Sequence, residues 1–302
     1  MATSRSDRRA PLLLVLPTLV ILLLALGYPI AWQLVTSLQK YGLRQQFGQP
    51  PEWVWLENYR TLVSDPTLWA VVARSLVFCV VVAFLTVAIG GLLALLMQRV
   101  GRFARIVLQV SLLLAWAMPV VAAMTVWIWI VDWRRGLLNW LLVTVGFEGA
   151  DQHNWLAEPI SFFVVAGVIV VWMSVPFVAL STYAGLTQVS TEVLEAAALD
   201  GANGIQRLRF IIVPLIAPVL SIVMLLQLIW DLRVFTQIKL LQDAGGVANE
   251  TNLLGTYVYQ LGTGEHPPLK SLYRVSLPVP ATPFLGRREE LATVVELLTR
   301  PD

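Results

Sequence analysis

Five long apolar stretches, separated by polar segments, constrain this chain more than any other feature. Each is long enough to cross a bilayer core, which takes an α-helix of about 20 residues. Of the 302 residues, 57% are hydrophobic and 13% are charged, whereas a soluble domain carries about 25% charged residues. We therefore predict an all-α, polytopic membrane protein. Its five transmembrane helices are expected at residues 11–30, 68–97, 106–131, 160–186 and 208–230.

The first stretch follows a short basic segment, and at first sight this pair of features resembles a secretory signal peptide. The apolar run is long enough to span the bilayer, however, and longer than the roughly 7–15 apolar residues of such a signal. We interpret it as a retained first transmembrane helix.

Basic residues flanking the spans indicate the orientation of the chain. Eight of them lie in short segments on one side of the membrane, and five lie in the loops at 39–67 and 132–158 on the other. Basic residues close to span ends favour the cytoplasm, so the N-terminus and the loop after the fourth span are predicted to be cytoplasmic. The eight are Arg5, Arg8, Arg9, Arg99, Arg102, Arg105, Arg207 and Arg209, and the five are Lys40, Arg44, Arg60, Arg134 and Arg135.

The loop after the fourth span contains a short predicted helix. Ser190 is a favourable N-cap residue, and Glu192 places a negative charge at the positive end of the helix. Apolar and mostly small residues recur at helical spacing and form one face. They are Val193, Leu194, Ala197 and Ala198.

Two glycines follow this helix. Gly201 and Gly204 are both expected to end it, because glycine tolerates the left-handed backbone of many helix ends. A new helix is predicted from Ile205, and Pro214 and Pro218 are expected to bend it, since proline removes a backbone donor.

Glu195-Ala196-Ala197 is followed after three residues by Gly201-Ala202, and then by Phe210, Ile211, Pro214 and Pro218. This spacing resembles the EAA loop of ABC importer permeases, and Asp200 before Gly201 is most similar to the sugar-importer branch (maltose and glycerol-phosphate permease type). The resemblance implies a coupling helix that docks into a cleft of a cytoplasmic ATPase, with carboxylates for polar contacts and the glycine for the turn. An ordinary amphipathic connector is the alternative. The coupling residues would be Glu195, Ala196, Ala197, Asp200, Gly201 and Ala202, followed in the motif by Phe210, Ile211, Pro214 and Pro218.

The resemblance also implies the partners and the location. A second permease subunit, a cytoplasmic ATPase dimer that binds ATP and Mg²⁺, and an extracytoplasmic solute-binding protein would assemble with this chain in the cell (inner) membrane bilayer. The chain itself would be a transport subunit with no catalytic residue, metal or cofactor. It contains no phosphate-binding loop and none of the common hydrolase motifs. Cys79 is the single cysteine, His153 and His266 show no ligand spacing, and no basic run suggests nucleic acid.

Solute contacts are expected from polar or aromatic side chains within the spans. The same residue types also serve as packing contacts or interface anchors, which is the alternative for each. Asp231 is predicted to form an interfacial ion pair with Arg233, with a proton relay as the alternative. The candidates for the solute path are Trp172, Ser174, Ser181, Gln227 and Trp230.

The C-terminal part departs from the family pattern. Residues 230–260 resemble the sugar-permease pattern, with a loop at Gly245 and Gly246, but no uncharged apolar run of membrane length follows Leu241. We expect a permease domain at 1–266 that lacks the last helix of the family, and an unrelated soluble tail at 267–302. The tail resembles the start of signal-transduction ATPases, and a variable tail is the alternative.

Three functions are open at this point. The first is a sugar-importer permease subunit, and the second is a truncated, inactive remnant of a gene fusion. The third is a stand-alone secondary transporter, which would show charges along an ion pathway or an inverted repeat.

Overall fold

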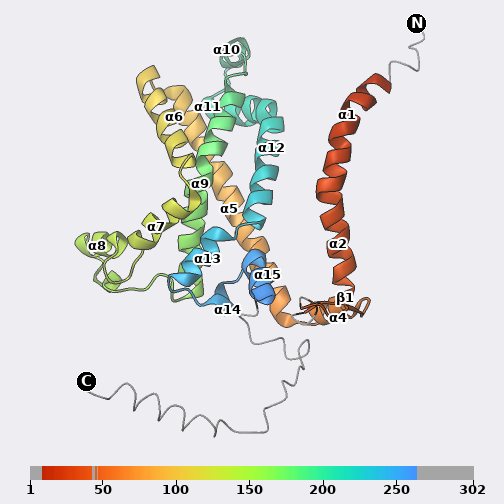
Figure 1. Ribbon diagram of the computed structural model, residues 1–302. Helices are drawn as coiled ribbons and strands as arrows, with labels where there is room; N and C mark the ends of the chain where they lie inside the picture. The colour runs from red at the N-terminus through yellow and green to blue at the C-terminus, as the bar shows by residue number, and fades with distance from the viewer. Residues whose placement is uncertain (1–8, 43–44, 46, 264–302) are drawn as a thin grey trace, which may run out of the picture. The chain divides into compact units, whose positions relative to one another are not determined.

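Two long helices run side by side through the centre of the molecule (Figure 1). The computed structural model describes residues 9–42, 45 and 47–263. Helix α5 spans Pro66–Arg99 and helix α9 spans Pro159–Leu186, in agreement with the predicted second and fourth spans. A Cβ atom added to Gly90 of α5 would lie 2.6 Å from Cγ1 of Val178 on α9. The two backbones are therefore in close contact at this point.

A third element packs on both of these helices. It begins with α11, Gly204–Arg207, continues as the π-helical turn η3, Leu208–Ile212, and becomes α12, Val213–Leu232. The predicted fifth span, 208–230, begins four residues too late. Pro214 has no backbone N–H, and its ring would clash with the carbonyl one turn earlier. The wider π-turn just before it accommodates this missing hydrogen bond.

Apolar side chains fill the space between these helices in two clusters. The larger cluster joins α5 and α9 to the helix that follows α12, and Phe162 and Ile169 are fully buried in it. The smaller cluster contains Met97, Leu186 and Ile216 from α5, α9 and α12. Burial of such side chains is the main favourable contribution to the packing of the three helices.

The predicted third span is bent. Helix α6, Arg102–Trp116, and helix α7, Val120–Ile130, meet at an angle of 97°. Pro119 lies between them with an extended backbone, at φ −58° and ψ 134°. Proline also disfavours a helical conformation in the residue before it, so the helix stops after Trp116 and restarts in a new direction.

The first span does not take part in the buried core. Helix α1, Arg9–Leu22, the π-turn η1, Leu23–Gly27, and helix α2, Tyr28–Ser37, follow one another directly. The membrane-spanning part, Leu14–Ser37, is seven residues longer at its end than the predicted 11–30, and its most apolar window has no buried residue. Pro29 follows directly after the π-turn η1, and this wider turn accommodates the backbone hydrogen bond that proline cannot form, so the helix does not stop near residue 30.

Short elements gather at one end of the central helices (Figure 1). Two strands pair there antiparallel, with Gln39 opposite Trp53. A glycine turn at Gly245, with φ +141°, follows the helix after α12, as the predicted Gly245–Gly246 loop requires. The elements are β1 (Gln39–Lys40), β2 (Glu52–Trp53), α4 (Glu57–Val63), α8 (Leu137–Thr144), η2 (Glu148–Ala150), α13 (Thr236–Asp243), α14 (Ala248–Thr251) and α15 (Leu254–Thr263).

In the described part of the chain, four helices are long and apolar enough to cross a membrane, and the bent pair α6–α7 makes a fifth. The predicted all-α polytopic class is therefore confirmed. The predicted tail at 267–302, and the last three residues of the predicted domain at 1–266, lie outside the described residues.

Candidate functional site

Helix α10, Thr191–Leu199, stands at the end of the bundle where α9 ends and α11 begins (Figure 1). The hydroxyl of Ser190 accepts a hydrogen bond from the backbone N–H of Glu192 at 3.2 Å. This bond satisfies one of the free donors of the first turn. The predicted N-cap is confirmed.

The other end of α10 closes on Gly201. Its φ is +83°, a left-handed conformation that favours glycine. The N–H of Ala202 donates to the carbonyl of Ala197 at 2.9 Å, and the N–H of Gly201 donates to Ala198 at 3.1 Å. These two bonds form a Schellman motif, so the prediction that Gly201 ends the helix is confirmed.

The prediction for Gly204 is wrong, because Gly204 is the first residue of α11. The side chain of Asn203 accepts from the N–H of Gln206 at 2.9 Å, and the side chain of Gln206 accepts from the N–H of Asn203 at 2.8 Å. This reciprocal capping box starts the next helix. Only residues 200–203 separate α10 from α11, and the helix ends on both sides are capped, so the connection forms a defined elbow.

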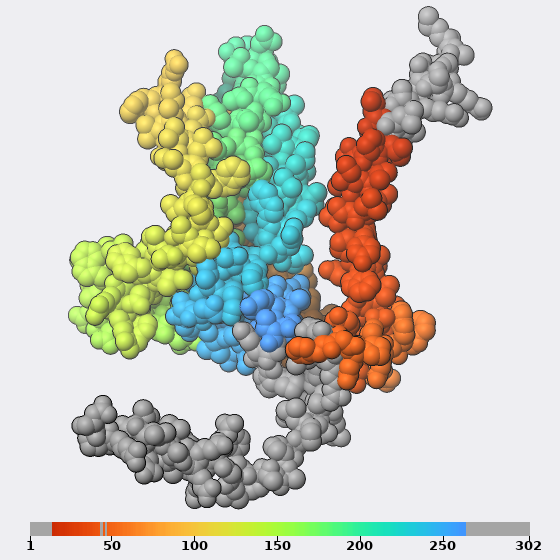
Figure 2. Space-filling view, in the orientation of Figure 1, coloured from red at the N-terminus to blue at the C-terminus, as the bar shows by residue number. Residues whose placement is uncertain are grey.

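Most of α10 projects away from the rest of the chain, and Figure 2 shows it at the tip of the molecule. Ala197 is the one member of this helix that is buried, and Glu195, Ala196, Asp200 and Gly201 are exposed, whereas Ala202 is half-buried. Leu199, which is 90% exposed, was not among the predicted coupling residues. It lies four residues after Glu195 and so shares its face, and this spacing could have identified it.

Polar contacts hold the neighbouring helix ends together. Arg105 of α6 donates from Nε to the carbonyl of Met97 at 2.7 Å, and its guanidinium lies 5.9 Å from the ring centre of Tyr183 on α9. Gln98 of α5 donates to the carbonyl of Leu186 at 3.3 Å. The base from which α10 projects is therefore braced by three helices.

The two prolines lie where α12 begins. Pro214 is the second residue of α12, directly after the π-turn, and Pro218 lies one turn further inside the helix. They occupy the stretch that connects the elbow to the membrane span. Their role in bending this span during transport stays a prediction.

Three of the solute-path candidates lie around an aromatic cluster. Trp230 of α12 meets Phe177 of α9 edge-to-face at 5.0 Å between ring centres, and Phe177 stacks on Trp116 of α6 at 6.1 Å. Ser174 and Ser181 are three residues before and four residues after Phe177, and therefore lie on the same face of α9. Phe177 was missed, although its helical spacing between the two serines could have revealed it.

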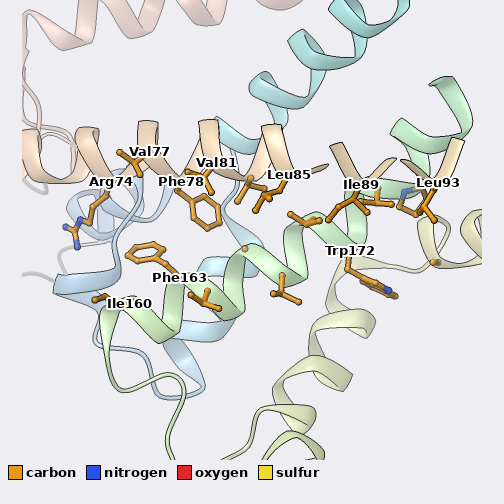
Figure 3. A pocket seen from close by; sticks show the side chains of 18 of the residues that line it. Arg74, Val77, Phe78, Val81, Leu85, Ile89, Leu93, Ile160, Phe163 and Trp172 are labelled. Carbon is orange, nitrogen blue, oxygen red and sulfur yellow. The ribbon is translucent and has the colours of Figure 1, made fainter. Parts of the chain in front are cut away.

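Trp172 lies in a different place. Its ring contacts Trp127 of α7 at 5.7 Å, and it lines an apolar groove of about 1000 Å³ between α5 and α9. Figure 3 shows this groove with Arg74 at one end and Trp172 near the other. No ring contact joins Trp172 to Trp230 among the described residues.

Gln227 lies inside the bundle with no exposed surface, and its amide donates to Oδ1 of Asp231 at 2.8 Å. The predicted ion pair between Asp231 and Arg233 is wrong. Residues two apart on a helix point in nearly opposite directions, so Asp231 is buried at 3% exposure while Arg233 is exposed. Within the described ranges the ion pair that forms is Lys239–Asp243, at 2.9 Å.

Comparison with known proteins identifies this architecture. Residues 86–264 match the family described as "Binding-protein-dependent transport system inner membrane component". The diacetylchitobiose uptake system permease protein DasB of Streptomyces coelicolor is 38% identical over 263 residues, which cover 87% of this chain and 80% of that protein. The trehalose/maltose transport system permease protein MalF of Thermococcus litoralis is 31% identical, with 83% of each chain covered.

A solved structure shows the same fold. The crystal structure of a bacterial ABC transporter involved in the import of the acidic polysaccharide alginate contains a chain that matches with a TM-score of 0.69 at 23% identity. The match covers 86% of this chain and 87% of the other. The helical fold, the capped α10 between two spans and the sequence match agree, and the chain belongs to the family of inner-membrane components of binding-protein-dependent transport systems.

Proposed function

We propose that this chain is a permease subunit of an ATP-driven ABC importer for a sugar or a related carbohydrate. The observation that carries the proposal is α10, a projecting helix that is capped at both ends and inserted between the spans α9 and α12. In the proposed assembly a cytoplasmic ATPase dimer binds ATP and Mg²⁺, and this chain hydrolyses nothing and needs no cofactor.

The sugar assignment is supported by the relatives. The names of the matched permeases refer to diacetylchitobiose and to trehalose and maltose. A related structure is described as an alginate transporter in complex with an alginate pentasaccharide-bound periplasmic protein. A solute-binding protein and a second permease subunit are therefore the proposed partners outside and within the membrane.

The contacts of α10 suggest how movement of an ATPase would reach the spans. The Schellman motif and the capping box leave only residues 200–203 between two capped helices. A force on the exposed residues Glu195 and Leu199 would therefore turn α10 and α11 together. It would pass through the π-turn into α12, where proline prevents a regular helical ladder.

We propose that aromatic and hydroxyl side chains of α9 and α12 contact the solute. Phe177 and Trp230 present ring faces and edges, and Ser174 and Ser181 lie beside Phe177 on α9. Such a combination suits a sugar, whose C–H face packs on aromatic rings while its hydroxyls form hydrogen bonds. Trp172 and Gln227 stay candidates for the path on sequence grounds.

Replacing Gly201 tests the coupling role. Gly201→Val forces a β-branched residue to φ +83° and should unfold the end of α10. We expect ATP-dependent uptake of radiolabelled diacetylchitobiose or trehalose to fall at least tenfold in cells that depend on this chain, with the amount in the membrane unchanged.

Gly204→Ala is the matched control, because its backbone is helical and nothing lies within 4 Å of an added Cβ. Its uptake should equal that of the unaltered chain. Full uptake by Gly201→Val would contradict the coupling role of α10.

A further inference from the structure

Two buried oxygen atoms on α12 lack hydrogen-bond partners. Oε1 of Gln227 and Oδ2 of Asp231 are both buried and accept no hydrogen bond within the described part of the chain. The two side chains are one helical turn apart and are already joined by the bond from Nε2 of Gln227 to Oδ1 of Asp231. Both orphan oxygens therefore belong to one bonded pair.

A negative charge at this place would be costly, because the residues are 0% and 3% exposed and a buried ionised carboxylate needs a counter-charge. Neighbouring elements supply none. On α5, Cys79 donates its thiol to the carbonyl of Leu228 at 3.4 Å, and Arg74 donates to the backbone of Glu250 and Ala70. The other titratable or charged groups on or next to the elements around the pair are Arg99 at the far end of α5, Tyr183 on α9, exposed Arg233 directly after α12, and Lys239 and Asp243, paired with each other on α13.

An inorganic cation would fit poorly. Hard cations such as Ca²⁺ and Mg²⁺ require about six oxygen ligands, and the pair offers two unpaired oxygens. A proton requires only one oxygen to hold it and one to accept its hydrogen bond. The two orphan oxygens provide this pair of positions.

We propose that Gln227 and Asp231 form a proton-binding site within the membrane span, in which Asp231 is a neutral carboxylic acid. The proton resides on Oδ2 of Asp231 and is donated to Oε1 of Gln227. A carboxylic acid and a carboxamide can exchange two parallel hydrogen bonds, and one of these is present at 2.8 Å. The second uses the two oxygen atoms that otherwise have no partner.

The position of the pair gives it a consequence for transport. Helix α12 continues from α11 and the elbow below α10, and it packs against α5 and α9. Loss of the proton would leave a buried carboxylate facing an amide oxygen. The carboxylate of Asp231 and the amide oxygen of Gln227 would then repel each other inside the bundle. Helix α12 would separate from its neighbours, or water would enter the bundle beside it.

Infrared difference spectroscopy on the full-length protein in lipid nanodiscs tests the proposal. The spectrum at neutral pH, minus that of Asp231→Asn, should contain the C=O stretch of a protonated carboxylic acid. Asp243→Asn is the matched control, because Asp243 is half exposed and paired with Lys239, and it should remove only carboxylate bands. A loss of carboxylate bands in Asp231→Asn would overturn the proposal.

The unaltered chain provides a second test that requires no variant to fold. Protein labelled with ¹³C-aspartate should show an isotope-shifted acid band at neutral pH, which declines as the pH is raised. Gln227→Leu should move this band to the higher frequency of an acid without an acceptor. The proposal would be abandoned if labelled protein showed no acid band at neutral pH.

Discussion

At the residue scale, Tyr257 joins the last described helix to the start of α5. Its hydroxyl donates to Oδ2 of Asp65 at 3.1 Å, and Oδ1 of Asp65 caps α5 by accepting from the N–H of Thr67 at 2.9 Å. Burial, together with the hydrogen bond to Asp65 and its charge, raises the pKa of Tyr257 to about 12 from 10.0. The hydrogen bond therefore persists at neutral pH.

This arrangement predicts an alkaline loss of stability. The unfolded chain loses the tyrosine proton near pH 10, whereas the folded chain keeps it to about pH 12. The contribution of Tyr257 is thus complete below pH 10 and is lost as the pH rises to 12. In Tyr257→Phe the free energy of unfolding at pH 7 should be lower by about 1–3 kcal/mol. The melting temperature should fall accordingly.

The difference between the two proteins should shrink from pH 10 to 12. Tryptophan fluorescence melting curves over a pH series measure both effects. A constant difference in melting temperature between the unaltered chain and Tyr257→Phe from pH 10 to 12 would contradict the assignment of the Tyr257–Asp65 bond.

Individual residues were predictable where their role depends on near neighbours in sequence. Ser190 and Gly201 act through bonds to residues within five positions of themselves, so the sequence contains the whole interaction. Gly204 was misassigned because Asn203 and Gln206 form a competing local motif. The ion pair of Asp231 with Arg233 was misassigned because residues two apart on a helix do not face each other, whereas the burial of Asp231 depends on packing against helices that are distant in sequence.

At the element scale, α5 and α9 approach each other closely at Gly90. A Cβ atom on Gly90 would be 2.6 Å from Cγ1 and 2.8 Å from Cβ of Val178, and 3.1 Å from the backbone nitrogen of Ala179. The side chain of valine is rigid at χ1, so it cannot turn away. Small residues that allow close helix approach are typical of membrane interfaces.

Two neighbouring glycines allow a matched test of this contact. Gly90→Ala should push the helices apart and reduce the free energy of unfolding by about 1–3 kcal/mol. Gly91→Ala, where nothing lies within 4 Å of the added Cβ, should raise it by about 0.5–1 kcal/mol through helix propensity. Melting temperatures in the same detergent compare the two, and an equal effect of both variants would contradict the packing argument.

Element boundaries were less predictable than element types. Apolar length identified the spans of the described residues, but hydropathy does not report direction, so the 97° bend between α6 and α7 was not predicted. The π-turns η1 and η3 also escaped prediction. They depend on how the backbone accommodates Pro29 and Pro214 within continuous helices.

At the scale of the whole molecule, the orientation in the membrane is open to a direct test. The chain has one cysteine, which is buried, so Cys79→Ser provides a clean background. Gln188→Cys, in the turn before α10, should react with a membrane-impermeant thiol reagent only after spheroplasts are lysed. Gly149→Cys, in the loop between the third and fourth spans, should react in intact spheroplasts.

These outcomes follow from the excess of basic residues on the α10 side. The reverse labelling pattern would place α10 outside the cell, and no cytoplasmic ATPase could then reach it. That result would also overturn the proposed role of the chain as a permease subunit driven by a cytoplasmic ATPase.

The family could be predicted from a short polar loop between apolar spans, and the helical fold of the described residues from the spans themselves. The arrangement of side chains around the solute path could not. Phe177, Trp116 and Trp230 meet from three helices, and such a meeting depends on helix rotation and tilt rather than on local sequence.

No residue in the most apolar window of the first span is buried among the described residues, and this has a consequence for how the protein can evolve. Substitutions there leave the packing of the buried core unchanged, provided that the segment stays hydrophobic and long enough to span the membrane. This region should accumulate changes faster than α5 or α9, and a comparable anchor from an unrelated protein should be able to replace it without unfolding the remainder.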